Sequence, residues 1–144
     1  MRLWLLGAAV AIALVVACGG GDGSEVEVRD LSAKLTEYAK GQRWGDIYDL
    51  MSAEFKARCA RDDFITGIQG RTPPDKMEAF QLALGTLRFI DLENVEVQGD
   101  TARGEAVTED VEGRKRNVQY FVKEDGEWHI APDPGTQGCA SSIE

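Results

Sequence analysis

The stretch VKEDGEWHI, residues 122–130, decides the fold. Apolar and polar residues alternate on both sides of Asp125-Gly126, and this dipeptide between two alternating runs is a strong signal for a two-residue hairpin turn. The stretch therefore predicts two antiparallel strands, Lys115 to Lys123 and Glu127 to Ala131.

Two more alternating segments precede this hairpin, Leu87 to Gln98 and Thr101 to Glu109. Turn signals separate the strands at Gly99-Asp100 and at Glu112-Gly113. Four strands joined in order by short turns predict a four-stranded antiparallel meander.

The first of these strands has a break in its pattern. Ile90 and Leu92 share one parity, whereas Val95 and Val97 share the other. A strand that buries one face keeps a single parity, so we expect a bulge or bend near Glu93-Asn94.

Side-chain size predicts space on the inner face of the sheet. The expected inward positions are small on the second strand and bulky on the next two. They are Ala102, Gly104, Ala106 and Thr108, and then Val118, Tyr120, Val122, Trp128 and Ile130. Small residues opposite bulky ones either allow close helix packing or leave a pocket.

Helical periodicity fills the chain before the strands. Apolar residues recur at three- and four-residue spacing from Val28 to Gly41 and from Trp44 to Met51, and shorter segments follow. Ser52 and Asp62 are placed to cap two of these helices, and the last helix runs from Pro73-Pro74 to Leu84. Residues 25–135 therefore predict an α+β domain, with N-terminal helices packed on a bent four-stranded antiparallel sheet.

The N-terminus has the features of a targeting segment. Arg2 precedes an apolar run from Leu3 to Val16, which is shorter than the ~20 residues that a membrane-spanning helix needs. We expect residues 1–17 to be a signal peptide, and an uncleaved anchor helix is the alternative. Both place the domain outside the cytoplasm.

The end of this run, Val15-Val16-Ala17-Cys18, resembles the lipobox of bacterial lipoproteins. The resemblance implies cleavage before Cys18 and thioether attachment of diacylglycerol to its sulfur. The domain would then be anchored by this lipid at the bacterial cell envelope. Residues 18–24 contain four glycines and predict a flexible tether.

Charge narrows the range of partners. The chain has 16 Lys and Arg against 25 Asp and Glu, a formal net charge of −9. This balance argues against nucleic acid as a partner, because phosphate backbones are bound by clustered cations. The one basic run, Arg114-Lys115-Arg116, lies beside a predicted turn. An acidic surface also gives no attraction to anionic headgroups, so membrane attachment would depend on the lipid.

Two cysteines remain after Cys18. Extracytoplasmic compartments oxidise thiols, so we expect a disulfide between Cys59 and Cys139 that ties the C-terminal tail, residues 136–144, to the helices. Two alternatives stay open. The cysteines can be buried free thiols, or they can bind a metal with His129, although these three residues lack the local spacing of common metal sites.

Helices followed by a sheet that ends in Asp-Gly-x-Trp-x-Ile (residues 125–130) resemble the nuclear transport factor 2-like superfamily, also called ketosteroid isomerase-like. Further points of similarity are Gly-Asp-x-Ala at residues 99–102, Tyr-Asp-Leu-Met-Ser at 48–52 and Arg-Asp-Asp-Phe at 61–64. The resemblance covers residues 25–135 and implies a cone-shaped α+β fold. Superfamily members include enzymes, ligand binders and adaptors, so the fold leaves function open.

The resemblance implies that isomerase and dehydratase relatives use a carboxylate inside the cone as a base. The sequence offers no such base, because Asp46 and Asp49 are on a polar helix face and Asp62 and Asp63 begin a helix. His129 alternates with apolar neighbours and is expected to point outward. We predict no catalytic residue, cofactor or metal.

We therefore expect a lipid-anchored, extracytoplasmic binding or assembly module without catalytic activity. Its partner would be an envelope protein or a small apolar ligand. The alternative is a membrane-tethered cone-fold isomerase, dehydratase or hydrolase. The residues expected to line a pocket are Trp44, Tyr48, Ala102, Gly104, Ala106, Tyr120 and Trp128.

Overall fold

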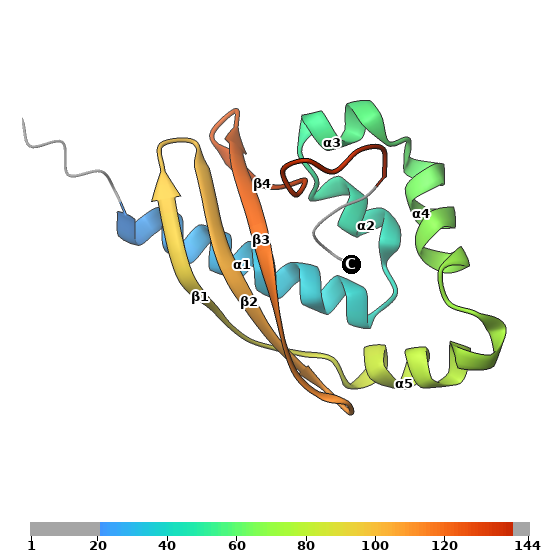
Figure 1. Cartoon of the computed structure of the whole chain (residues 1–144). Helices are drawn as coiled ribbons and strands as arrows, with labels where there is room; N and C mark the ends of the chain where they lie inside the picture. The colour runs from blue at the N-terminus through green and yellow to red at the C-terminus, as the bar shows by residue number, and fades with distance from the viewer. Residues whose placement is uncertain (1–20, 140–144) are drawn as a thin grey trace, which may run out of the picture.

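The computed structural model describes residues 21–139. The predicted leader, Cys18 and residues 140–144 lie outside the described residues. Helices come first and strands follow, which confirms the predicted α+β class (Figure 1). The elements are α1 (Gly21–Lys40), α2 (Trp44–Asp49), α3 (Ala53–Arg58), α4 (Arg61–Gly70), the 3-10 turn η1 (Pro74–Lys76), α5 (Met77–Thr86), β1 (Arg88–Gln98), β2 (Thr101–Asp110), β3 (Gly113–Glu124) and β4 (Glu127–Ala131).

The first helix is longer than expected. It begins at Gly21, so four residues that we assigned to the tether belong to α1 instead. Helix propagation from the amphipathic segment outweighs the low propensity of Gly21 and Gly23. Val28, Leu31 and Leu35 are buried along the side of α1 that packs on the sheet (Figure 1).

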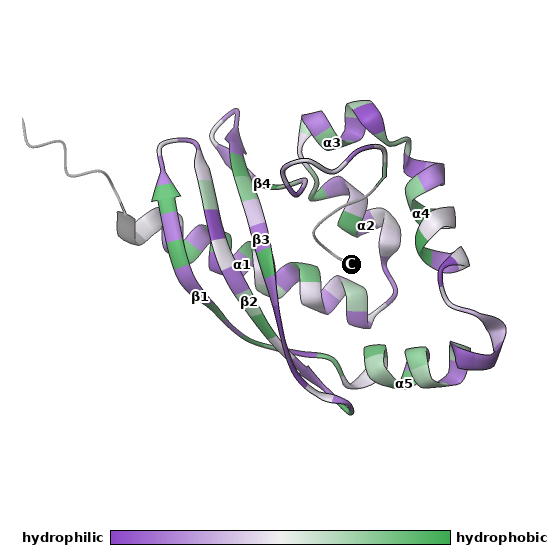
Figure 2. Cartoon of the chain, viewed as in Figure 1, coloured by the Kyte–Doolittle hydropathy of each residue, from purple (hydrophilic) through white to green (hydrophobic). Residues whose placement is uncertain are grey.

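The sheet is an antiparallel meander in the order β1-β2-β3-β4, as predicted. Its turns lie between residues 98 and 101, 110 and 113, and 124 and 127. Hydrophobic and hydrophilic residues alternate along the strands, as Figure 2 shows. One face of the sheet therefore packs on α1 and the other meets solvent.

β1 changes register twice. The shift between Glu93 and Glu96 confirms the predicted bulge, and Asn94 there has a positive φ of 52°. A second shift follows Phe89, which was not expected. It turns Phe89 toward the core and leaves Ile90 exposed, contrary to the predicted parity.

The inner face of β3 is also different from the prediction. Gln119 and Phe121 are its buried residues, whereas Val118, Tyr120 and Val122 are only half-buried. The backbone register explains this, because Gly104 pairs with Gln119 and Ala102 with Phe121. Residues paired in an antiparallel ladder point to the same face, so odd-numbered positions of β3 face inward.

The link between α2 and α3 covers the outer edge of β4. The backbone N–H of Ser52 donates to the carbonyl of Ile130 at 2.8 Å, and the N–H of Ile130 donates to the carbonyl of Leu50 at 2.9 Å. The side chain of Ser52 caps α3 by accepting from the N–H of Phe55, as predicted. Asp62 does not cap α4, whose N-cap is Ala60.

Cys59 and Cys139 are brought together, with 2.04 Å between their sulfur atoms. They are 80 residues apart in the chain. Cys59, at the end of α3, is buried in the same core cluster as the aromatic rings of Tyr48, Phe55 and Phe64. The pairing holds the segment after β4 against the helices.

Candidate functional site

A cavity of about 630 Å³ lies between the helices and one end of the sheet. This volume is in the range of small-molecule binding sites. Its helical walls are mainly apolar. They are formed by Leu35 and Ala39 of α1, Trp44 of α2, Phe64 and Ile68 of α4, and Ala79, Phe80, Ala83 and Leu84 of α5, with Leu87 and Cys139 nearby.

α5 is the most loosely packed wall. None of its residues is buried, although its composition is largely hydrophobic (Figure 2). Leu82 has 58% of its surface exposed, while Phe80, Ala83 and Leu84 are half-buried beside the cavity. In a filled core, neighbouring side chains would cover these three residues completely. They are only half-buried because they line a cavity.

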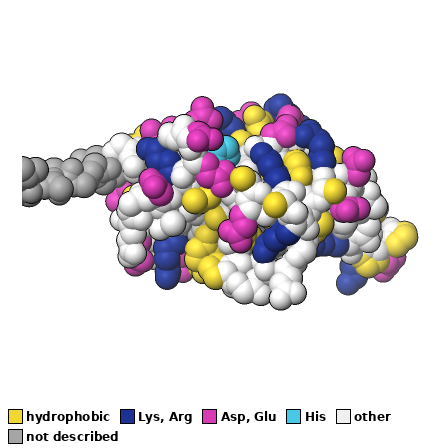
Figure 3. Space-filling view, turned by 90° about the horizontal axis from the view of Figure 1, so that it is seen from above, with side chains coloured by type: hydrophobic (Ala, Val, Ile, Leu, Met, Phe, Trp, Pro, Cys, Tyr) yellow, Lys and Arg dark blue, Asp and Glu magenta, His cyan; other side chains and the backbone are white. Residues whose placement is uncertain are grey.

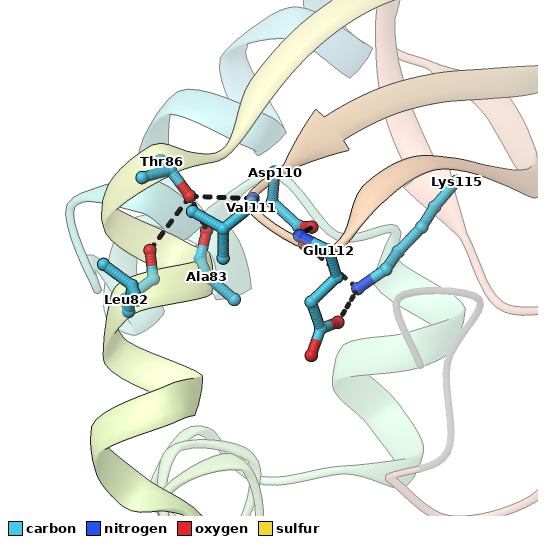
Figure 4. Close-up of polar contacts among 7 residues, drawn as sticks. All are labelled: Leu82, Ala83, Thr86, Asp110, Val111, Glu112 and Lys115. Carbon is cyan, nitrogen blue, oxygen red and sulfur yellow. Dashed lines mark hydrogen bonds and ion pairs between the residues drawn. The ribbon is translucent and has the colours of Figure 1, made fainter.

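The C-terminal end of α5 is tied to the tip of the β2–β3 hairpin, as Figure 4 shows. The backbone N–H of Val111 donates to Oγ1 of Thr86 at 3.2 Å, and this hydroxyl donates to the carbonyl of Leu82 at 2.9 Å. The hairpin therefore holds one end of the helix that covers the cavity.

The sheet supplies the polar wall. Thr108 and Asp110 of β2 line the cavity together with Lys115, Asn117 and Gln119 of β3. The three β3 residues are two positions apart, so their side chains follow one another along the inner face. A polar stripe thus runs along the sheet opposite the apolar helices.

Gln119 lies at the inner end of this stripe and has only 6% of its surface exposed. Its Oε1 accepts a 2.7 Å hydrogen bond from the hydroxyl of Ser32, which is fully buried in α1. Thr36, one turn further along α1, donates to the carbonyl of Ser32 at 3.1 Å. The polar groups of α1 under the cavity are therefore joined to β3.

Asp110, Glu112 and Lys115 form an ionic cluster at the other end (Figure 4). The ammonium group of Lys115 donates to Asp110 at 3.0 Å and to Glu112 at 2.6 Å. The Asp110 side chain is only 5% exposed, and it also accepts from the N–H of Glu112 at 2.8 Å.

Burial by itself raises the pKa of the Asp110 carboxyl group. The hydrogen bond from Lys115, the N–H groups of Glu112 and Gly113 and the charge of Lys115 outweigh this effect, so the pKa lies below its ordinary value. The hydrogen bonds to Glu112 and Asp110 raise the pKa of Lys115. Both groups are therefore charged at neutral pH.

Charged residues elsewhere are mixed in sign. Figure 3 shows Lys and Arg side chains interspersed with Asp and Glu over one face of the molecule. Two residues of the predicted basic run, Arg114 and Arg116, make ion pairs with Glu109 and Glu93 on β2 and β1. Together with the pairs of Lys115, these contacts neutralise the run.

Only Trp44 of the predicted pocket residues lines the cavity. Tyr48 is packed against Phe55 and Phe64, and its hydroxyl donates to the carbonyl of Cys59 at 2.7 Å. Trp128 is buried in the core under Lys123, whose ammonium is 5.6 Å from its ring centroid. Tyr120 lies on the outer face of the sheet, paired with Arg103.

The small residues of β2 do not leave the predicted space. A Cβ atom placed on Gly104 would lie 2.9 Å from Cγ of Leu92, so Leu92 already fills this part of the face. Ala102 and Ala106 are buried in the same core. The β2 residues that line the cavity, Thr108 and Asp110, lie further along the strand, past Ala106.

Sequence reasoning missed Asp110, Lys115, Asn117 and Gln119. A signal for them is present in the turns. A two-residue turn pairs residues of opposite parity, so inward even-numbered positions on β2 and β4 require inward odd-numbered positions on β3. We instead assigned the inner face of β3 by apolarity, which favoured Val118, Tyr120 and Val122.

A scan against models of protein families finds no family that matches the chain, and a search of curated proteins finds no match. Within residues 21–139, no three His, Cys, Asp or Glu side chains are grouped so as to hold a metal ion. No helix in that range is both long enough and apolar enough to cross a membrane.

Proposed function

We propose that this protein is an extracytoplasmic binding module, and that the cavity between the helices and the sheet takes a small, largely apolar molecule. The observation that carries the proposal is the cavity itself, with an apolar helical wall opposite a polar strip of sheet. Ligand sites commonly combine an apolar lining with a few placed polar groups.

The membrane attachment in this proposal rests on the sequence before the described residues. Cys18, the proposed lipid attachment site, precedes the start of α1 by three residues. Leu35, which lines the cavity, is roughly 20 Å further along the helix at 1.5 Å per residue. A lipid at Cys18 would thus anchor the end of α1 that is remote from the cavity, which leaves the cavity accessible.

The resemblance to the nuclear transport factor 2-like superfamily supports the same proposal, because a cavity between helices and a curved sheet is what that fold implies. An envelope protein partner remains a further proposal for the outer surface.

A membrane-tethered enzyme is the second candidate, and one observation bears on it. Asp110 is a buried carboxylate that lines the cavity, although no inward carboxylate was expected. A general base works best when its pKa is near the ambient pH, whereas the partners of Asp110 lower its pKa. This favours binding over proton abstraction.

The test is to place a bulky side chain in the cavity and to determine whether a co-purified small molecule is lost. Gly67 of α4 lines the cavity, and a Cβ atom on it would meet nothing within 4 Å. Gly85 of α5 is equally open but does not line the cavity, which makes it the matched control. The full chain would be purified from membranes as the wild type, Gly67→Trp and Gly85→Trp.

Co-purified small molecules would be identified by mass spectrometry. We expect a bound apolar molecule in the wild type and in Gly85→Trp, and its loss from Gly67→Trp. Equal amounts in both variants, or none in any sample together with no binding of added apolar probes, would contradict the proposal.

A further inference from the structure

In the side-chain amide of Gln119, the oxygen is hydrogen-bonded within the described part of the chain and the nitrogen is not. Its Oε1 accepts from Ser32, and no group of residues 21–139 accepts from its Nε2. Nε2 is not completely buried, since it is not one of the fully buried side-chain nitrogens of residues 21–139 that lack a hydrogen-bond partner. Gln119 lines the cavity, so its two remaining N–H groups are available there.

This arrangement is unusual for so deeply buried a residue. Buried polar groups are nearly always hydrogen-bonded, so an acceptor atom of a ligand in the cavity would complete the partners of this residue. With Oε1 accepting from the Ser32 hydroxyl, the amide presents its donor side to the cavity. Asn117, the next inward residue of β3, also lines the cavity and adds a second amide.

From this geometry we infer that the ligand has an apolar body and an uncharged hydrogen-bond acceptor, such as a ketone, ester or amide carbonyl, which accepts from Nε2 of Gln119. The inference rests on the proposed function, since it specifies the ligand of the same cavity. The apolar body would pack on α4 and α5, opposite the sheet.

At the polar stripe of the sheet, the charges favour an uncharged acceptor over an anion. Lys115 is the cation of the polar stripe, and its ammonium is already held by Asp110 and Glu112. Asp110, whose carboxylate is ionised, also lines the cavity and would repel an anion at this end of the stripe. Arg71 and Lys76 line the cavity from the α4–α5 connection, so preference for an anionic ligand is the contrary outcome to test.

Three probes separate these outcomes. One is a long-chain methyl ketone, the second is the hydrocarbon in which a methylene group replaces its carbonyl oxygen, and the third is the long-chain carboxylate of equal length. Affinities would be measured by displacement of a fluorescent apolar reporter from the full chain in lipid nanodiscs. Gly67→Trp, which places an indole ring at the cavity wall, serves as the blank.

We expect the wild type to bind the ketone about three- to tenfold more tightly than the hydrocarbon, as one hydrogen bond would give. Gln119→Glu keeps an acceptor for Ser32 but removes the donor, so it should abolish this preference. Gln81→Glu, on the exposed surface of α5, makes the same chemical change and should preserve it.

If Gln119→Glu is too unstable to measure, the pair Ser32→Ala with Gln119→Met removes both partners together, and it should also lose the preference. Equal wild-type affinity for ketone and hydrocarbon, or tighter binding of the carboxylate, would overturn this inference and leave the proposed cavity function intact. Absence of displacement relative to the Gly67→Trp blank would overturn both.

Discussion

The side chain of Leu92 of β1 reaches over Gly104 of β2, with its Cγ 2.9 Å from the point where a Cβ atom on Gly104 would be. The glycine therefore makes room for a leucine that is itself fully buried. This part of the inner face is therefore filled, and the β2 residues that line the cavity, Thr108 and Asp110, lie further along the strand.

Substitution of Gly104 should destabilise the protein. Gly104→Leu forces Leu92 out of its place, and overpacking of this kind costs on the order of 1–3 kcal/mol of unfolding free energy. Denaturant titration measures the change. Gly67→Leu is the matched control, because a side chain at this position enters open space. Replacing a glycine within a helix also favours folding, so the unfolding free energy should be unchanged or higher by about 1 kcal/mol. Equal losses at both positions would contradict the difference between filled space at Gly104 and open space at Gly67.

The pairing of Cys59 with Cys139 predicts one cross-linked peptide in the purified native protein, detected by peptide mapping without reductant. Loss of this link through Cys139→Ser should lower the unfolding free energy by about 4 kcal/mol, because the closed loop is long. Reductant should bring the wild type to the stability of the variant. Alkylation of two free thiols in the native protein would show that the prediction is wrong.

Lys115→Met should make stability less dependent on pH. The lowered pKa of Asp110 adds stability above its unfolded pKa, and this is lost as the pH falls through the folded pKa. The raised pKa of Lys115 adds stability below its unfolded pKa, and this is lost as the pH rises through the folded pKa. The full contribution is therefore present between roughly pH 4 and pH 10.

In that interval we expect Lys115→Met to cost about 0.5–1 kcal/mol, since the Lys115 side chain is partly exposed. Urea titrations from pH 3 to pH 9 would measure it. Lys34→Met, at an exposed position of α1, changes the net charge equally and serves as the control. A difference that persists unchanged at pH 3 would contradict the role of the Asp110 pair.

Cys18→Ala should prevent lipid attachment, so that the protein is released from membranes or accumulates as the uncleaved precursor. Membrane fractionation and intact mass of the wild type provide the measurement. Wild-type protein that retains residues 1–17 and an unmodified Cys18 would refute the proposed anchor.

Local sequence was enough to predict the strands, their order and the β1 bulge near Asn94. Alternation and turn residues such as Asp125-Gly126 act within a few positions, so they can be recognised in a single sequence. The Cys59–Cys139 pair could be predicted by a different argument, because the two cysteines are expected to lie in a compartment that oxidises thiols. Helix starts were less certain, because Gly21 is a poor helix former that joins α1 through propagation from its neighbours.

The inner face of β3 could not be read from apolarity. Val118 and Tyr120 are more hydrophobic than Asn117 and Gln119, yet they lie on the outer face. The strand register decided which β3 side chains point inward. The two turns that flank β3 pair its odd-numbered residues with the inward residues of β2 and β4, and in a pleated strand the even-numbered residues then point outward.

The sequence by itself determined the α+β order, the meander and the residues that form its turns, since these depend on interactions between near neighbours. Only the tertiary structure decided where the cavity lies and that Gln119 and Asp110 line it. Ser32 and Gln119 are 87 residues apart. Their hydrogen bond, like the contact of Leu92 with Gly104, arises when the packing of α1 and the strand register are set together, and neither partner signals the other along the chain.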